Sequence, residues 1–553
     1  MANRNNIRRP VLAATIFASL LLSFLLAFSR PQLELRAQGV APARQAPAAE
    51  ETPAGPQRRE RAALVLATSP SARELARRID RAIDESDAAS ARWGVFVTSL
   101  RDGRVLYARE ADRNFAPASN MKLYTTAVAL DLLGADYRWR TSVLADGAPD
   151  ASGTIRGDLT LYGRGAPDLS SREQKDDRPA ALEQLADELY GRGVRQVRGD
   201  IIGDESYLRG EPLGDGWLWN DVQWYFGAEV SALTINGNQL SVAVTPNKSA
   251  GEAAAVRLTP ATDYVQLQND TGTVERGRPA TIGITRGLSD NELRVWGDFP
   301  AGGGSVTARL SIHRPALWAA LLFRDALKAR GISVEGQTRA VDARESNRTA
   351  RVDPEHAVEL AFVTSRPLGE LVRLTNKESI NLNAELILRT LGRERRASLP
   401  DADEPQRRNR ADDQAGLALI RLWLERAGIS TETLSLHDGS GLSRLDLVTP
   451  EATAGMLVAM SKVSSAGVFR DSLPVAGRDG TLKYRLRSEA AGRILAKTGT
   501  LSQINSLSGY ATTADDEPLA FSIICNEATG DAAGTRTIDA IAALLALYRE
   551  TER

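Results

Sequence analysis

The chain has 553 residues, of which 42% are hydrophobic and 25% charged, and its formal net charge is −1. This length exceeds what one hydrophobic core normally holds and predicts three or four domains. The near-zero net charge argues against a nucleic-acid-binding protein, because these carry a basic surface. The single cysteine excludes an internal disulfide framework, and the three histidines lack the spacing of a metal site.

The N-terminus has the pattern of an export signal. Arg4, Arg8 and Arg9 precede an uncharged, mostly apolar run over residues 11–28. A basic segment followed by an apolar run is typical of export signals, and this run is also near the minimum length of a membrane-spanning helix. Residues 1–36 are therefore predicted to be a signal peptide or a membrane anchor. The remainder is expected outside the cytoplasm, in the periplasm or another extracytoplasmic space.

Residues 37–68 are rich in Ala, Pro, Glu, Gln and Arg without an apolar period, which predicts a flexible linker. A helix is expected over 69–87, because Ser69 suits the N-cap and Pro70 the first helical position. The stretch WGVFVTSLRDGRVLYARE then alternates around Asp102-Gly103. This alternation predicts a β-hairpin.

The stretch NFAPASNMKLYTTAVALDLLG predicts a helix that follows Pro117 and ends at Gly134. Ser119 and Lys122 stand three residues apart at its start, so their side chains share one helix face. A serine needs a base to become a nucleophile, and a lysine serves as one when burial or a nearby cation lowers its pKa. The spacing alone is weak evidence, because a solvated helix lysine gives the same pattern.

Residues 138–354 consist mainly of short alternating runs separated by Gly, Asp and Asn turns, with one helix expected at about 179–192. They are predicted to form a mostly β insert, with a nested sub-domain at about 163–229. Helical patterns return after residue 355, at 368–375, 381–391, 414–427 and 536–548. Three strands with a hairpin at Asp515-Asp516 precede the last helix.

The tetrapeptide Lys497-Thr498-Gly499-Thr500 ends an apolar strand. Such an edge offers backbone amides, a cation and hydroxyls, which suit a substrate carboxylate and a developing oxyanion. The glycine permits a close approach by another backbone or by a ligand. The alternative is an ordinary lysine on an edge strand.

A Ser-x-Asn triplet is the third candidate element. The literal Ser289-Asp290-Asn291 lies between two alternating runs and is typical of a turn. Ser379-Ile380-Asn381 opens a helical pattern instead. There the serine hydroxyl could relay a proton and the asparagine amide could hold a peptide carbonyl. Helix capping by either residue is the alternative explanation.

SxxK, SxN and KTG in this order resemble the motif set of penicillin-binding proteins and serine β-lactamases. The long insert between the first two motifs, together with HDGSGLSRLDLVTP and LPVAGRDGTLKYRL, resembles one branch, the S13 D-alanyl-D-alanine carboxypeptidases or low-molecular-mass class C penicillin-binding proteins. The resemblance covers about residues 69–550, and Ile380 departs from the small or polar residue frequent there. It implies an α/β (α+β) transpeptidase-like fold, in which 69–137 and 355–553 form an antiparallel sheet flanked by helices.

The resemblance implies a serine-type D-Ala-D-Ala carboxypeptidase, also active as a DD-endopeptidase, that acts on peptidoglycan stem peptides and is acylated by β-lactams. The implied catalytic residues are Ser119, Lys122, Ser379, Asn381 and Lys497. The implied substrate-binding residues are Thr498, Gly499, Thr500, Leu442, Arg444 and Asp221. No metal, cofactor or nucleic acid is implied, and no pattern specifies an oligomeric state. A serine β-lactamase and a catalytically idle peptidoglycan-binding scaffold are the alternatives.

Overall fold

The computed structural model describes residues 66–169, 179–344, 353–400, 404 and 410–550. The predicted signal or anchor at 1–36 and most of the predicted linker at 37–68 lie outside these residues. Within the described ranges, none of the helices combines the length and the apolar character that a membrane span requires.

A five-stranded antiparallel sheet joins the two ends of the described chain in the order β17-β18-β19-β1-β2. Its strands are β1 (Arg92–Ser99), β2 (Val105–Arg109), β17 (Ile494–Leu501), β18 (Ile504–Thr512) and β19 (Pro518–Asn526). Strand β1 pairs with β19 along its whole length. The predicted hairpin and the last three predicted strands therefore form one sheet, as the sequence resemblance implies.

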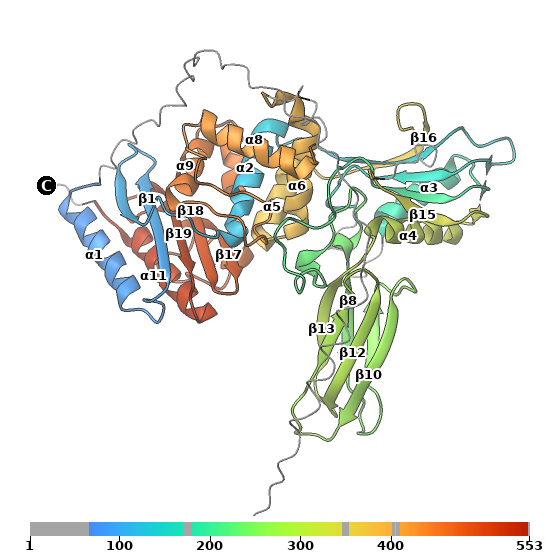
Figure 1. Cartoon of the computed structure of the whole chain (residues 1–553), viewed down its shortest axis with the longest axis horizontal. Coiled ribbons are helices and arrows are strands. Elements are labelled where there is room, and N and C mark those ends of the chain that lie inside the picture. The colour runs from blue at the N-terminus through green and yellow to red at the C-terminus, as the bar shows by residue number, and fades with distance from the viewer. Residues whose placement is uncertain (1–65, 170–178, 345–352, 401–403, 405–409, 551–553) are drawn as a thin grey trace, which may run out of the picture. The chain divides into compact units, whose positions relative to one another are not determined.

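Strand β19 shows how this sheet separates two cores, because successive residues of a strand face opposite sides. Phe521, Ile523 and Cys525 pack with α1 (Pro70–Asp84) and α11 (Asp531–Leu547). Ala520 and Ile524 belong to the core on the other face. That second core includes residues of α2 (Met121–Leu133), α5 (Leu368–Glu378), α6 (Asn381–Arg395), α8 (Asp412–Arg426), α9 (Pro450–Met460) and α10 (Ala466–Ser472). Figure 1 shows the sheet between these two groups of helices.

The insert contains two further sheets. Residues of both sheets pack in one hydrophobic core with helices α3 (Ala180–Gly191) and α4 (Pro315–Ala329). One has the order β15-β7-β5-β3-β16 and the other β14-β6-β4. Their strands are β3 (Arg140–Ala145), β4 (Thr154–Ile155), β5 (Leu159–Tyr162), β6 (Gln196–Val197), β7 (Ile201–Asp204), β14 (Ser333–Val334), β15 (Thr338–Val341) and β16 (Val358–Thr364). The sequence interpretation predicted α3 but missed α4, whose first turn has no side-chain cap.

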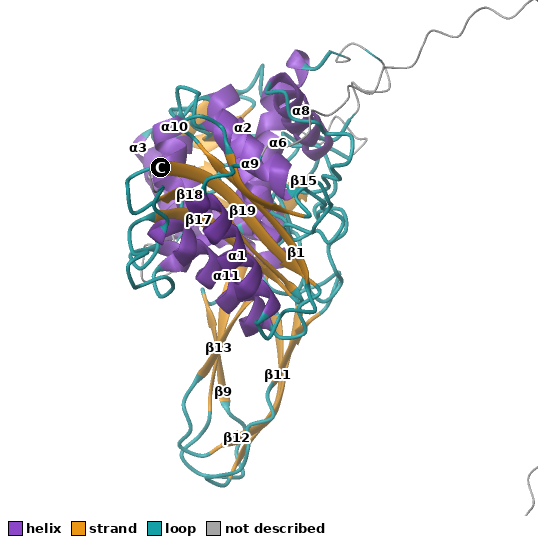
Figure 2. Ribbon diagram, turned by 90° about the vertical axis from the view of Figure 1, so that its left-hand side faces the viewer, coloured by secondary structure: helices purple, strands orange, loops and turns teal. Residues whose placement is uncertain are grey.

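Two three-stranded sheets, β13-β8-β9 and β10-β12-β11, form from the middle of the insert. Their strands are β8 (Gln239–Thr245), β9 (Ala255–Thr259), β10 (Gln266–Val274), β11 (Gly283–Arg286), β12 (Glu292–Pro300) and β13 (Val306–Ser311). Between β8 and β13 the chain contains strands and loops but no helix, as Figure 2 shows.

The nested sub-domain predicted at about 163–229 contains β6 and β7. Strands β6 and β7 from that range pair with β4, β5, β14 and β15, which lie on both sides of it in the sequence. Strands β8 to β13 pair only with one another in the sheet order. The strands that pair only with one another therefore occupy residues 239–311. Alternation along the sequence cannot reveal this grouping, because it is determined by pairing between strands that are distant in the sequence.

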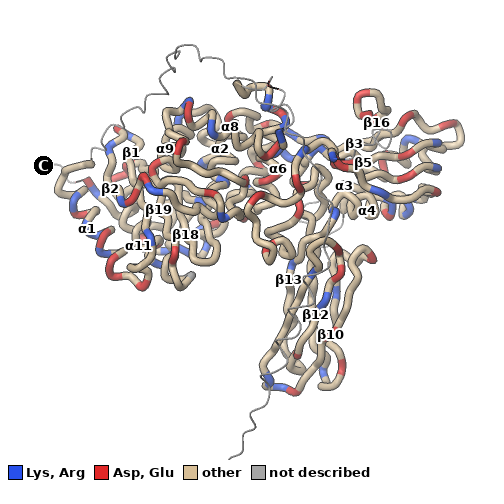
Figure 3. The backbone as a smooth tube through the Cα atoms, viewed as in Figure 1, with Lys and Arg blue, Asp and Glu red and all other residues tan. Residues whose placement is uncertain are grey.

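Acidic and basic residues are interspersed along the described elements (Figure 3). Helix α1, for example, carries Glu74 beside Arg77, and Arg81 in its last turn lies close to Glu85. Such mixed surfaces agree with the near-zero net charge of the sequence.

Candidate active site

Ser119 lies in a short 3-10 turn, η1 (Ala118–Asn120), immediately before α2. Ala118 adopts a φ of +47°, in the left-handed region, which turns the chain sharply before the helix. Two glycines approach this turn closely. A Cβ atom on Gly441 would lie 1.8 Å from the carbonyl oxygen of Ala118, and one on Gly499 would lie 3.0 Å from the backbone nitrogen of Ser119. Strand β17 therefore passes directly beside the Ser119 amide.

Lys122, in the first turn of α2, is fully buried and meets three oxygen atoms. Its Nζ lies 2.8 Å from Ser119 Oγ, 2.6 Å from Asn381 Oδ1 and 2.6 Å from the carbonyl oxygen of Ser440. The sequence prediction that Ser119 and Lys122 touch agrees with this geometry. The alternative of a solvated helix lysine does not, since the side chain of Lys122 has no exposed surface.

Burial lowers the pKa of Lys122 to about 7, because the ammonium form loses its hydration. The carboxyl groups of Asp438, Glu385 and Asp446 act in the opposite direction. A lysine with this pKa is about half neutral at pH 7, whereas an ordinary lysine is almost entirely protonated. The amine can therefore accept a proton from Ser119.

Ser379 and Lys497 form a second pair. Ser379 has a φ of +57° and is the C-cap of α5, two residues before the first residue of α6. Lys497, in β17, is fully buried and places Nζ 2.8 Å from Ser379 Oγ. Burial, and after it the nearby charge of Lys122, lowers the pKa of Lys497 well below its ordinary value. Two lysines thus share one dehydrated site.

Asn381 connects this site to the insert. Its Oδ1 faces Lys122, and its Nδ2 donates to the carbonyl oxygen of Phe226 at 2.9 Å. Phe226 belongs to the short turn η2 (Tyr225–Gly227) of the insert. Because the amide has two N–H groups, it can donate a second hydrogen bond besides the one to Phe226. The literal Ser289-Asp290-Asn291 lies between β11 and β12, as the sequence interpretation predicted for a turn.

Strand β17 is the outermost strand of its sheet. Residues 474–476 hydrogen-bond to the start of its outer edge, at 494–496, and among the described residues no pairing is formed there by Lys497 and the residues that follow it in β17. Thr498 Oγ1 lies 2.7 Å from Thr481 Oγ1, which comes from the short turn η6 (Gly480–Leu482). Thr500, two residues further along β17, is exposed. Hydroxyls and amides therefore line the same edge as Lys497, an arrangement that fits a carboxylate and an oxyanion.

The three remaining predicted residues differ in how they are placed. Asp221 and Arg444 lie close enough for the arginine charge to act on the carboxyl, although burial raises the pKa of Asp221 overall. Arg444 Nη1 donates to the carbonyl oxygen of Ser502, just beyond β17. Leu442, by contrast, is only 3% exposed and offers almost no surface to a ligand in this state.

The sequence interpretation missed a buried carboxyl group one turn after Asn381. Glu385 Oε1 accepts from the backbone nitrogen of Gly439 at 2.9 Å, and burial raises its pKa to about 8. Asp446, in the loop between Gly439 and α9, has a pKa raised well above its usual range, again mainly by burial. The i, i+4 spacing of Asn381 and Glu385 on α6 is the only sequence signal that indicated such a residue.

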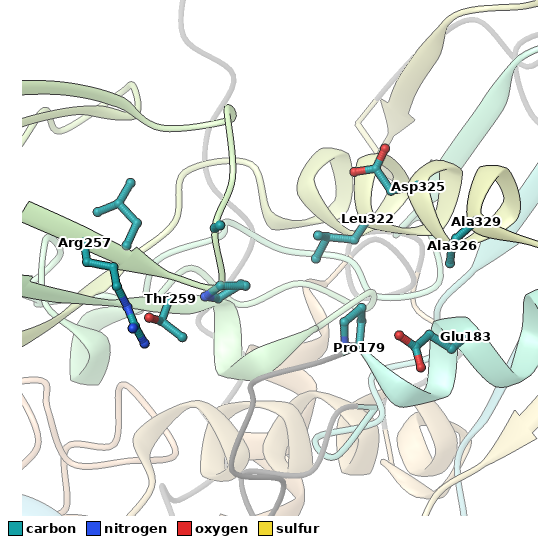
Figure 4. Close-up of a pocket in the computed structure, with 11 residues that line it drawn as sticks. Pro179, Glu183, Arg257, Thr259, Leu322, Asp325, Ala326 and Ala329 are labelled. Atoms are coloured by element: carbon teal, nitrogen blue, oxygen red, sulfur yellow. The ribbon is translucent and has the colours of Figure 1, made fainter.

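A separate cavity of about 470 Å³ lies in the insert and contains none of the predicted site residues. Helices α3 and α4 and the end of β9 form its walls, with Glu183, Asp325 and Arg257 as the charged side chains (Figure 4). In the described parts of the chain, no group of three His, Cys, Asp or Glu side chains is arranged to hold a metal ion.

Comparisons with known proteins agree with this architecture. The sequence profile of the D-Ala-D-Ala carboxypeptidase 3 (S13) family matches residues 75–548. The chain is 36% identical over 498 residues to a D-alanyl-D-alanine carboxypeptidase of Actinomadura sp. (strain R39), covering 88% of this chain and 87% of that protein. It is 25% identical over 443 residues to D-alanyl-D-alanine carboxypeptidase DacB of Haemophilus influenzae, covering 79% of this chain and 86% of that protein.

The fold is similar to the crystal structure of penicillin binding protein 4 (dacB) from Haemophilus influenzae, with a TM-score of 0.72 and 23% identity over 85% of this chain and 99% of that chain. A structure of the same protein complexed with a β-lactam matches with a TM-score of 0.66 and 22% identity, over 85% of this chain and 99% of that chain. At this identity, the similarity establishes the fold and not the residue roles.

Proposed function

Since the chain belongs to the D-Ala-D-Ala carboxypeptidase 3 (S13) family and is thus a serine-type carboxypeptidase, we propose that it removes the terminal D-alanine of peptidoglycan stem peptides through an acyl-enzyme on Ser119. The observation that carries this proposal is the buried pair of Ser119 and Lys122, with 2.8 Å between Oγ and Nζ. A lysine dehydrated in this way has the protonation state that a general base needs.

In the acylation step, Ser119 Oγ bonds to the carbonyl carbon of the penultimate D-alanine while its proton passes to Lys122 Nζ. The carbonyl oxygen becomes an oxyanion, which the backbone amides of Ser119 and Thr500 would stabilise. The closeness of Gly499 to the Ser119 amide supports this pairing of two amides from different elements.

Collapse of the tetrahedral intermediate breaks the bond to the leaving D-alanine nitrogen, which must gain a proton. Ser379 would donate its hydroxyl proton to that nitrogen and recover one that originates on Lys122. Lys497 and Thr498 would hold the terminal carboxylate, and Asn381 would orient the acyl part through its free N–H. The distance of 2.8 Å between Lys497 Nζ and Ser379 Oγ supports their joint action at the leaving group.

Water then attacks the acyl carbon, gives a proton to Lys122 and breaks the bond to Ser119 Oγ, which recovers that proton. The same acyl transfer cuts a peptide cross-link when the leaving amine belongs to another stem peptide, so DD-endopeptidase activity is part of the proposal. β-Lactams would acylate the same hydroxyl, because their strained amide occupies the place of the D-Ala-D-Ala bond.

The wider assignments follow from the same proposal. Asp221 and Arg444 would contact the stem-peptide side chain at the rim, and Leu442 would shape the loop beneath them. Export of the chain, with residues 1–36 as a signal peptide or anchor, would place the enzyme beside its substrate. Residues 69–137 and 355–553 are proposed as the catalytic domain and 138–354 as the insert, with β16 (Val358–Thr364) of the second catalytic segment adding a strand to the sheet of the insert.

The proposal is tested by measuring D-alanine release from a synthetic peptide that ends in D-Ala-D-Ala. The full-length protein should release one D-alanine per peptide, and Ser119→Ala should release none above background. A matched peptide that ends in L-Ala should be left intact. Failure of the folded protein to cleave the first peptide, combined with rapid penicillin hydrolysis, would indicate a serine β-lactamase instead. Failure to react with either compound would indicate an idle scaffold.

A further inference from the structure

One loop of the insert reaches the loop that faces the proposed base. Trp217 Nε1 donates to Asp438 Oδ2 at 2.9 Å, across more than 200 residues of sequence. A Cβ atom on Gly216 would lie 2.5 Å from Ser443 Oγ. The backbone of Gly216, next to Trp217, therefore lies close to the side chain of Ser443. Gly216 and Trp217 thus lie against the loop formed by residues 438–443.

The carboxylate of Asp438 organises its own loop. It accepts hydrogen bonds from the backbone nitrogens of Ser440 at 3.1 Å, Gly441 at 2.6 Å and Ser443 at 2.9 Å, and from Ser440 Oγ at 2.9 Å. These four donors all lie within five residues of Asp438. The indole of Trp217 donates to Asp438 from outside the loop. Together with the contact of 2.8 Å between Asp215 Oδ2 and His437 Nδ1, it joins the loop to the insert.

Ser440 connects this loop to the candidate active site, because its carbonyl oxygen lies 2.6 Å from Lys122 Nζ. We propose that Trp217 is a positioning residue that acts through Asp438 and Ser440 to hold Lys122 in place for acyl transfer. The inference rests on the proposed roles of Ser119 and Lys122. It gives the insert a part in catalysis that does not require it to contact the substrate.

The charged and titratable groups around Lys122 determine what the loss of this indole should do. Glu385 on α6, Asp438 and Asp446 from the loop, and Lys497 on β17 act on it electrostatically. Without the indole donor, the loop can shift and Ser440 can no longer accept from the ammonium form of Lys122 at its present distance. An acceptor that stabilises the charged form raises a lysine pKa, so its loss lowers that pKa.

Trp217→Phe tests the inference, because phenylalanine keeps an aromatic ring and removes the N–H donor. Trp423→Phe is the matched control. Trp423 Nε1 donates to Asp131 Oδ2 at 2.8 Å between α8 and α2, a bond of the same kind away from Ser119. The full-length protein and both variants are compared in the second-order rate of acylation by benzylpenicillin from pH 5 to pH 9, together with their melting temperatures.

We expect Trp217→Phe to lower the rate at the pH optimum about tenfold, as the loss of a hydrogen bond to a charged group does. The acidic limb of the pH–rate profile of Trp217→Phe should also move to lower pH. Trp423→Phe should have the same rate and the same acidic limb as the unchanged protein. An unaltered rate in Trp217→Phe would overturn the inference. A second result would also overturn it. If Trp217→Phe lowers the rate without moving the acidic limb of the pH profile, and lowers the melting temperature as much as Trp423→Phe does, Trp217 has a structural role only. An unchanged protein that fails to react at all would instead overturn the proposed function on which the inference depends.

Discussion

The active site and the insert use charged residues in opposite ways. Around Ser119, the ammonium groups of Lys122 and Lys497 and the carboxyl of Glu385 are almost completely buried, and burial shifts all three pKa values. In the insert, the pair of Arg294 and Asp270 spans the surface, with side chains 58% and 36% exposed. Water and salt screen the second arrangement but not the first.

The difference supports the proposed site around Ser119 and Lys122. A buried charge lowers stability unless its neighbours compensate for it, so a group of such charges persists where it performs chemistry. A surface pair contributes little to stability and depends little on its neighbours. The four predictions below test this contrast, in order of decreasing expected effect.

Removal of the proposed base should have the largest effect. In Lys122→Ala, acylation by benzylpenicillin should slow by about 10³- to 10⁴-fold, because Ser119 loses its proton acceptor. Stopped-flow or quenched intact-mass kinetics measure the rate. Lys328→Ala, which removes an exposed lysine of α4 in the insert, should acylate at the normal rate. A Lys122→Ala rate within tenfold of normal would contradict the assignment.

The pH dependence of the unchanged protein should reflect the lowered pKa of Lys122, at about 7. Only the neutral amine accepts a proton, so activity is lost as the pH falls through that value. The acylation rate should fall about 50-fold between pH 7 and pH 5. A lysine with an ordinary pKa would instead let the rate rise through pH 9 to 10, and that profile would speak against a dehydrated base.

A half-buried ion pair should give an intermediate effect on stability. Arg104 Nη2 lies 2.7 Å from Glu517 Oε2, and the Glu517 side chain is only 1% exposed. Arg104→Ala leaves this carboxylate with Ser99 as its remaining side-chain partner, so the free energy of unfolding should fall by about 2 kcal/mol. Denaturant titration measures it. A change below about 0.5 kcal/mol would show that water replaces the guanidinium without cost.

The smallest effect is expected in the insert. Arg294→Ala removes the partner of Asp270, which remains accessible to water. The free energy of unfolding should change by no more than about 0.5 kcal/mol, and acylation should be unchanged. The same titration serves as the measurement. A loss as large as that of Arg104→Ala would remove the distinction between the two regions.

The local motifs of the site were predictable from the sequence because each depends on neighbouring residues. Ser119 and Lys122 share one helix turn, and Lys497 to Thr500 follow one another along a strand. The choice of Ser379-Ile380-Asn381 over the literal triplet also rests on local context, since one lies between helices and the other between strands.

Contacts between distant segments were not predictable in the same way. Asp438 belongs to the stretch HDGSGLSRLDLVTP, but nothing in this stretch indicated that Trp217 donates to its carboxylate. Glu385 is close to Asn381 in sequence, yet it accepts a hydrogen bond from the backbone nitrogen of Gly439, which only the folded chain brings near. The grouping of the strands in the insert depends on such contacts too, since the pairing of strands and not alternation along the sequence determines it.

The central claim is that Ser119 is a nucleophile activated by Lys122, and intact-mass analysis after incubation with benzylpenicillin tests it most directly. The account predicts one slowly released penicilloyl adduct per chain, located by peptide mapping on Ser119 and absent from Ser119→Ala. A folded protein that forms no adduct and hydrolyses no penicillin, or that carries its adduct on another residue, would contradict the claim.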